Sequence, residues 1–174
     1  GDPFVFSRGG EEVSFLEEHG ISVEIIPGVT SGIAASSYVG IPLTHRYGAS
    51  SVTFVTGHET SEKQEKSVDW RQLASSSNSL VVYMGIRNIE YIVEELIIGG
   101  MKKNTRCAAI QEATLKNQKS LVTELSELPV MIKKYNIKPP AIVLIGRIVD
   151  FQVKNTVTKL SSVNLQKIKK NLIT

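Results

Sequence analysis

Segments with a strand pattern alternate with segments that have a helix pattern along this chain of 174 residues. Short apolar or alternating runs predict strands at 21–26, 51–56, 80–84, 107–111, 120–125 and 141–145. Helical patterns lie between several of these runs. Because parallel neighbours need a long crossover connection, this alternation predicts an α/β protein in which at least part of the sheet is parallel.

The clearest helix is predicted over 88–98, where aliphatic side chains recur along one stripe. Asn88 stands at its N-cap position, and Gly99-Gly100 end the pattern. A second helix is predicted over 11–20, because acidic residues open it and a glycine closes it. Further helices are predicted to begin at Thr30-Ser31 and near Ser126.

Residues 1–150, here called the body, and residues 151–174, the tail, differ in their charge. Residues 151–174 contain five Lys and no Asp or Glu, whereas residues 1–150 contain 15 basic and 17 acidic side chains. The body therefore lacks the net positive charge of a nucleic-acid-binding domain. The longest apolar runs are also far shorter than the ~20 residues of a membrane-spanning helix. We expect no nucleic-acid or membrane partner, and we expect the tail to be a solvated or partner-packed helix.

Metal and disulfide chemistry have little support. Cys107 is the single cysteine, so no internal disulfide and no multi-Cys zinc site can form, and this usage fits a reducing cytoplasm. His45 and His58 have no partner at a metal-ligand spacing. A Ser–His–Asp pattern, a P-loop and a G-x-G-x-x-G motif are missing as well, which argues against a hydrolase and against dinucleotide binding.

Two clusters near the start of the chain contain residues suited to ligand binding. Gly1-Asp2-Pro3 is typical either of a loop leaving a strand, where open α/β sheets bind ligands, or of an ordinary Asp-Pro turn. A few residues later, two glycines separate Arg8 from Glu11. A guanidinium fork beside accessible backbone suits a carboxylate ligand, but Arg8 could instead pair with Glu11 or Glu12.

Two further clusters follow predicted strands. Thr30 and Ser31 begin a helix rich in small residues, whose free N–H groups could bind an anionic group; the alternative is that Thr30 is a plain N-cap. The same stretch leads to Arg46 in a loop that follows a proline. Met84 ends a buried strand and is either core filler or a polarizable surface for an apolar or sulfur-bearing ligand.

Six segments, taken in this order, resemble the tetrapyrrole methylase family. They cover roughly residues 1–150 and are 1-GDPFVFSRGGEE-12, 26-IPGVTSGIAASSYVGIPLTHR-46, 54-FVTGH-58, 69-DWRQLA-74, 80-LVVYMGIRN-88 and 139-PPAIVLIGRIV-149. The Gly-Asp-Pro element is shared by the wider family. The Arg-Gly-Gly-Glu-Glu, Pro-Leu-Thr-His-Arg and Tyr-Met-Gly elements together are similar to members that methylate uroporphyrinogen III at carbon.

The resemblance implies a two-domain α/β fold with S-adenosylmethionine bound in the cleft between the domains, S-adenosylhomocysteine as product, and a homodimer. It implies methylation of uroporphyrinogen III to precorrin-2, a step of siroheme and cobalamin biosynthesis. On this basis we expect 1–46 to be the end of an N-terminal parallel-sheet domain with its linker. We expect 47–150 to be a C-terminal mixed-sheet domain and 151–174 a basic tail. The family's opening strand and first loop would precede residue 1, so a proposed acid/base Asp and Lys cannot be placed.

The resemblance also implies roles for individual residues. Cofactor contacts are expected at Gly1, Asp2, Val5, Thr30, Ser31, Met84 and Ala113. Substrate-side catalytic positions are expected at Arg8, Glu11 and Arg46. Arg8 is a poor base, because a guanidinium has a pKa above ~12, so we expect it to orient the acidic substrate. Ser7 and Ala113 depart from the family's usual glycines without removing a charge.

Two alternatives remain open at this point. The chain could belong to a methyltransferase that acts on a later precorrin or another acceptor, or it could be a non-catalytic dimerisation fragment. Competition with uroporphyrinogen III separates the first alternative from the main hypothesis, and binding of S-adenosylhomocysteine separates the second.

Overall fold

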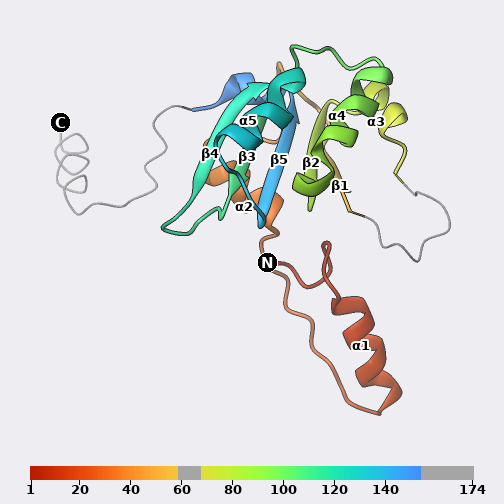
Figure 1. Cartoon of the computed structure of the whole chain (residues 1–174). Coiled ribbons are helices and arrows are strands. Elements are labelled where there is room, and N and C mark those ends of the chain that lie inside the picture. Colours follow the sequence, from red (N-terminus) through yellow and green to blue (C-terminus); the bar gives the residue numbers. More distant parts are fainter. Residues whose placement is uncertain (59–67, 154–174) are drawn as a thin grey trace, which may run out of the picture.

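A computed structural model describes residues 1–58 and 68–153, and most of this part is a five-stranded sheet with helices on both faces (Figure 1). The strand order is β1-β2-β5-β3-β4. The strands are β1 (Thr53–Thr56), β2 (Ser79–Tyr83), β3 (Arg106–Gln111), β4 (Lys119–Glu124) and β5 (Ala141–Gly146). The five strands predicted between residues 51 and 145 are therefore confirmed.

The sheet is mixed. Strands β1 and β2 are parallel, because a crossover that contains helix α3 (Trp70–Ser76) connects them. The other neighbouring pairs are antiparallel, and β5 lies between β2 and β3. The prediction of a partly parallel sheet is confirmed. This order brings the ends of β2 and β3 to the same edge of the sheet as the start of β5.

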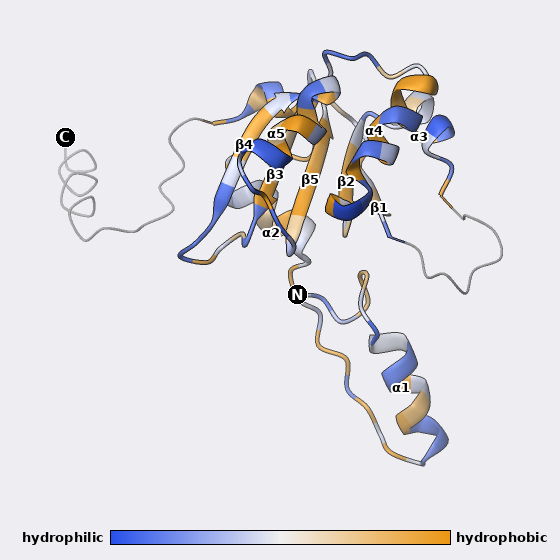
Figure 2. Cartoon of the chain, in the orientation of Figure 1, coloured by the Kyte–Doolittle hydropathy of each residue, from blue (hydrophilic) through white to orange (hydrophobic). Residues whose placement is uncertain are grey.

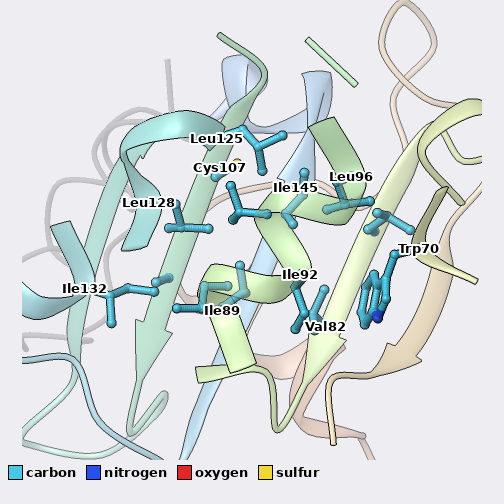
Figure 3. Close-up of a cluster of buried hydrophobic side chains, with 14 of the residues drawn as sticks. Trp70, Val82, Ile89, Ile92, Leu96, Cys107, Leu125, Leu128, Ile132 and Ile145 are labelled. Carbon is cyan, nitrogen blue, oxygen red and sulfur yellow. The ribbon is translucent and has the colours of Figure 1, made fainter. Parts of the chain in front are cut away.

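One face of the sheet is covered by α3, α4 (Ile89–Ile98) and α5 (Leu128–Lys134). Their apolar stripes pack on alternate residues of β2, β3 and β5, which are hydrophobic along most of their length (Figure 2). Figure 3 shows this core, in which Ile92 and Leu96 of α4 are fully buried. The helix predicted near Ser126 is confirmed by α5 and the single 3₁₀ turn before it (Leu125–Glu127).

The predicted C-terminal end of α4 is confirmed, but the predicted N-cap hydrogen bond of Asn88 is not. Gly99 occupies the C-cap position, as expected. Asn88 stands at the N-cap position, but its side chain makes no capping hydrogen bond; its amide Nδ2 donates to the carbonyl of Gly57 at 2.7 Å. Asn88 therefore ties α4 to the loop that follows β1.

The opposite face of the sheet is covered by α2 (Ser31–Tyr38) and a 3₁₀ turn over Arg147–Phe151. Ala35, Val39 and Ile41 are buried against this face. The described residues from about 30 onward thus belong to the sheet and the elements packed on it. The division of the chain into 1–46, 47–150 and 151–174 stays a prediction, and residues 154–174 of the tail lie outside the described residues.

Helix α1 (Gly9–Glu18) stands away from the sheet, and a long extended segment leads from it to α2 (Figure 1). The helix predicted over 11–20 is confirmed, with a start two residues earlier. The strand predicted over 21–26 is wrong, since this segment has no strand assignment. A strand needs a neighbour for its N–H and C=O groups, and within 1–58 and 68–153 none lies beside it.

No helix of residues 1–58 and 68–153 is long and apolar enough to cross a membrane.

Candidate functional site

A cavity of about 550 Å³ opens at the sheet edge where β2 and β3 end and β5 begins. We call it the Met84 cavity. Its walls come from the start of α2, the turn after β2, the loop between β3 and β4, and the segment that enters β5. It is lined by Ser31, Tyr83, Met84, Ile86, Ile110, Glu112, Ala113, Leu115, Pro139, Pro140, Ala141 and Ile142. Ser31, Met84 and Ala113, which the sequence predicted as cofactor contacts, are thus brought together.

Sharp backbone turns place the side chains of this wall. Met84 follows the last residue of β2 with φ 54°, and Glu112 follows β3 with φ 48°. Side-chain-bearing residues rarely adopt this left-handed region, and such positions cluster at binding sites. At Thr114 (φ 74°) the backbone N–H donates to Gln118 Oε1 at 2.8 Å, which closes the β3–β4 loop. The turns leave Met84 half-exposed at the cavity.

The cavity wall is mostly apolar. Aliphatic side chains supply most of it, and Glu112 carries the single charge among the described lining residues. Gln111 is buried just before it and fixes the neighbouring backbone, because its Oε1 accepts the N–H of Lys138 at 2.7 Å. An apolar cavity with a few polar groups is typical of a small-molecule site.

Tyr83 joins α2 to this wall. Its hydroxyl accepts the N–H of Gly32 at 2.9 Å and lies 2.8 Å from Oγ1 of Thr30. Thr30 is the N-cap residue of α2, but its side chain makes no capping hydrogen bond. The interpretation of Thr30 as a plain N-cap is therefore wrong, because its side-chain hydroxyl is hydrogen-bonded to the hydroxyl of Tyr83 and not to the backbone of α2. Sequence analysis missed Tyr83 as a site residue, although the Tyr-Met-Gly element contained it.

Asp2 holds the first loop against the entry to α2. Its carboxylate accepts the N–H of Phe4 at 2.8 Å and the N–H of Gly28 at 3.1 Å. These two hydrogen bonds lower the pKa of the Asp2 carboxyl below its ordinary value, the Phe4 bond most. Gly1, Asp2 and Val5 are not among the residues that line the Met84 cavity. Their loop contacts one lining residue, Tyr83, whose ring centroid lies 4.6 Å from that of Phe6.

The predicted substrate-side residues lie in two separate places. Arg8 Nε donates to Glu11 Oε2 at 2.8 Å at the start of α1. The alternative in which Arg8 pairs with Glu11 or Glu12 is therefore confirmed, with Glu11 as the partner. The Arg8 side chain is 81% exposed, and Glu11 raises its pKa further. Arg8 is therefore a permanent cation that can still contact a ligand. Together with Glu12, Phe15 and Leu16, Arg8 and Glu11 line an open hollow of about 540 Å³.

Arg46 lies in a turn on the α2 side of the sheet. Backbone hydrogen bonds between His45 and Ala49 close this turn. The ring of His45 stacks on Phe151, with 3.7 Å between the ring centroids. Arg46 is exposed and lines neither the Met84 cavity nor the hollow beside Arg8. The structure thus does not unite Arg8, Glu11 and Arg46 in one site.

Comparison with known proteins gives matches over most of the chain. A family model described as Tetrapyrrole (Corrin/Porphyrin) Methylases matches residues 1–129. Uroporphyrinogen-III C-methyltransferase from Synechocystis sp. is 44% identical over 151 residues, which are 87% of this chain and 57% of that protein. A protein of the same name from Bacillus subtilis is 46% identical over 156 residues, or 88% of this chain and 60% of that protein.

A solved structure agrees with these matches. Uroporphyrin-III C-methyl transferase from Thermus thermophilus, complexed with S-adenyl homocysteine, superposes with a TM-score of 0.72 at 36% identity. The match covers 86% of this chain and 64% of that chain. The chain thus spans less than two thirds of the length of the proteins it matches.

Proposed function

This chain belongs to the tetrapyrrole methylase family, and from that premise we propose that the protein methylates carbon atoms of uroporphyrinogen III. S-adenosylmethionine is the methyl donor, S-adenosylhomocysteine the product, and two transfers give precorrin-2, an intermediate for siroheme and cobalamin. Support comes from two relatives of 44% and 46% identity that carry the name of this activity. The proposal concerns the whole protein, since the chain spans about three fifths of those relatives.

The Met84 cavity is the observation that carries the proposal. Its volume of about 550 Å³ is within the ~300–1,000 Å³ range of small-molecule sites. Aliphatic walls suit an adenosyl group, and the thioether of Met84 offers a polarizable surface beside it. We assign Ser31, Met84 and Ala113 to this wall. We assign Gly1, Asp2, Val5 and Thr30 to the adjoining edge, where Asp2 holds the loop in place.

When bound, S-adenosylmethionine supplies an electrophilic methyl carbon to an electron-rich pyrrole carbon. The task of this chain is to hold both partners in line. Correct placement can lower a bimolecular barrier by about 7–11 kcal/mol. The turns at Met84 and Glu112 form a rigid wall for that purpose, because each is fixed at the end of a buried strand.

Arg8 and Arg46 are the proposed binding groups for the acidic substrate, which carries many carboxylates. A guanidinium binds a carboxylate through two parallel hydrogen bonds. Glu11 accepts the Nε–H of Arg8, and the terminal N–H groups of the exposed guanidinium are the ones proposed to bind a carboxylate. Because a guanidinium is already protonated at neutral pH, Arg8 does not take up the proton that the ring carbon loses. Its role is to orient the substrate.

The proposal includes a homodimer and a cytoplasmic location. Ile33 and Tyr38 of α2 are exposed on the surface opposite α3–α5, as is Tyr47 in the Arg46 turn. Large apolar groups gathered in this way suit contact with a second copy. A single, fully buried cysteine, Cys107, suits a reducing compartment. Sedimentation equilibrium measures the dimer, and a mass equal to one chain at high concentration contradicts it.

Two measurements test the function. Calorimetry with S-adenosylhomocysteine is expected to give saturable heat with this chain, and the absence of heat contradicts the donor site. Transfer of a labelled methyl group to uroporphyrinogen III, measured with the protein at the full length of its relatives, tests the activity. Label that enters a later precorrin, but not uroporphyrinogen III, would instead support the alternative acceptor. Binding of neither compound would support a dimerisation module.

A further inference from the structure

We propose that Tyr83 is a positioning residue that keeps the two sides of the Met84 cavity in the arrangement that binds the methyl donor. Its hydroxyl holds the start of α2, and its ring holds the loop that contains Asp2. This inference rests on the proposed function, because it concerns the same cavity.

The hydroxyl is in a position to hold α2. Tyr83 is 5% exposed and Thr30 is 6% exposed, so water does not replace their hydrogen bond readily. The first N–H groups of a helix have no partner within the helix. Here the N–H of Gly32 finds one in the Tyr83 hydroxyl at 2.9 Å. A Cβ at Gly32 would run into that hydroxyl, which shows how closely the helix approaches β2.

The hydrogen bonds of the hydroxyl are made to protein groups at the start of α2. One lone pair accepts from Gly32, and Oγ1 of Thr30 lies 2.8 Å away as the second partner. A phenol has one proton to donate, so these two partners satisfy most of its capacity. Tyr83 lines the cavity but acts through Thr30 and the backbone of α2. Ser31, between these two partners, is thereby fixed at the cavity wall.

The ring of Tyr83 holds a second segment. The ring centroid of Phe6 lies 4.6 Å away with the planes tilted by 39°, and that of Phe54 in β1 lies 6.1 Å away. Phe6 has φ 49°, in the left-handed region, so its backbone conformation depends on contacts of this kind. Phe6 continues the loop that Asp2 anchors on Gly28. One side chain at the end of β2 therefore connects α2, the first loop and the turn at Met84.

The direct test removes the hydroxyl with Tyr83→Phe and measures the affinity for S-adenosylhomocysteine by calorimetry. Loss of these buried hydrogen bonds loosens one wall of the cavity, so we expect affinity to fall about tenfold, which is about 1.4 kcal/mol. The matched control is Thr123→Val. Thr123 is also buried and donates to Glu127 at 3.0 Å, but it does not line the cavity. We expect the control to bind within about twofold of wild type.

A second measurement needs no donor. Amide hydrogen exchange at Gly32 and Ile33 should accelerate in Tyr83→Phe, whereas exchange in α4 stays unchanged. Thr30→Val supplies a further variant should Tyr83→Phe fail to fold, and Thr30→Ser, which keeps the hydroxyl, should restore affinity. In the double variant Tyr83→Phe/Thr30→Val the loss should not exceed that of Tyr83→Phe alone, because Tyr83→Phe already removes the Thr30–Tyr83 hydrogen bond.

The outcomes separate this inference from the function on which it rests. If the wild-type chain does not bind S-adenosylhomocysteine, the donor site is overturned and the inference falls with it. If the wild type binds and Tyr83→Phe binds equally well, only the inference is overturned. Equal losses in Tyr83→Phe and Thr123→Val would also overturn it, because they would indicate a general loss of stability.

Discussion

Several polar side chains near the Met84 cavity hold backbone groups in place. Asp2 accepts two backbone N–H groups, Tyr83 accepts one, and Gln118 accepts that of Thr114. Among these bonds, that of Tyr83 is buried, and a satisfied buried polar group makes a site rigid. Arg8 differs, since its only described partner is the exposed Glu11. A fixed wall and an exposed cation correspond to the different tasks of holding a donor and receiving an anion.

Replacing Arg8 by Ala should lower kcat/KM for uroporphyrinogen III by about 10- to 100-fold, mostly through KM. The reason is the loss of a charge-assisted contact, about 1.5–3 kcal/mol. Arg8→Lys should recover only part of the loss, because Lys has no planar fork. Initial rates of labelled methyl transfer by the full-length protein measure the effect. Arg147→Ala is the control, because it removes an exposed arginine outside the proposed substrate site. Wild-type activity of Arg8→Ala would contradict the proposal that Arg8 binds the substrate.

Replacing Asp2 by Asn should lower the free energy of unfolding at neutral pH, because an amide accepts N–H groups more weakly than a carboxylate. The pKa of the folded Asp2 carboxyl is below its ordinary value of 3.8. A depressed pKa gives stability that is present above the unfolded pKa and lost as pH falls through the folded pKa. The difference from wild type should thus be constant above about pH 5 and shrink below about pH 4. Urea denaturation across this range tests it, and a pH-independent difference would contradict the link.

At the scale of elements, α2 and β2 approach each other closely because small residues lie between them. Gly32 faces the Tyr83 hydroxyl and Val81 Cγ1, so there is no room for a Cβ atom. On the other face, α4 packs through a stripe of aliphatic side chains that alternates with exposed residues. The cavity therefore rests on a tightly packed helix on one side and a larger core on the other.

Replacing Gly32 by Ala should lower the free energy of unfolding by about 1–3 kcal/mol, because the new methyl group overpacks the α2–β2 contact. Gly10→Ala in α1 is the control, since a Cβ there meets nothing within 4 Å. Alanine should favour that helix by up to ~1 kcal/mol. Denaturant unfolding of both variants measures the contrast. An unchanged Gly32→Ala protein would show that α2 can move away from β2.

Replacing Ile92 by Ala should lower the free energy of unfolding by about 2–5 kcal/mol, because its side chain is fully buried in the core under α4. Ile98→Ala, at the exposed end of the same helix, should change stability by no more than about 0.5 kcal/mol. Both variants remove the same atoms from the same element. Similar losses for the two would argue against the observed orientation of α4.

At the scale of the whole molecule, the described chain divides into a packed sheet body and an N-terminal arm that consists of α1 and the extended segment after it (Figure 1). Several large apolar residues of this arm are exposed, among them Phe15, Ile26 and Val29. The Phe6–Tyr83 contact joins the loop before α1 to the sheet body, and the Asp2–Gly28 hydrogen bond joins the same loop to the end of the extended segment.

This division predicts a pattern of amide hydrogen exchange. Amides of 22–27 should exchange at nearly the rate of an unstructured peptide, because no strand pairs with them in the described part of the chain. Amides of β2 and β5, in the middle of the sheet, should be protected by at least about 10³-fold. Exchange followed by mass spectrometry gives both values. Strong protection at 22–27 would indicate a strand pairing with another chain in solution.

The elements of the sheet body could be predicted from the sequence, because each has its own local signal. Short apolar or alternating runs mark β1 to β5, and Gly99 marks the end of α4. The resemblance to the tetrapyrrole methylase family also predicted that Ser31, Met84 and Ala113, which are distant in the sequence, contact the same cofactor, and all three line the Met84 cavity.

Only the tertiary structure decided what those elements do together. Local alternation at 21–26 could not reveal whether a neighbour was present to form a strand. The partners of Thr30 and Asn88 depended on groups 53 and 31 residues away, which no local cap signal contains. Glu112 and Tyr83 became cavity residues because β5 inserts between β2 and β3 and aligns their ends. Hydrogen-bond partners and cavity walls are long-range properties, and they are settled only when the chain packs.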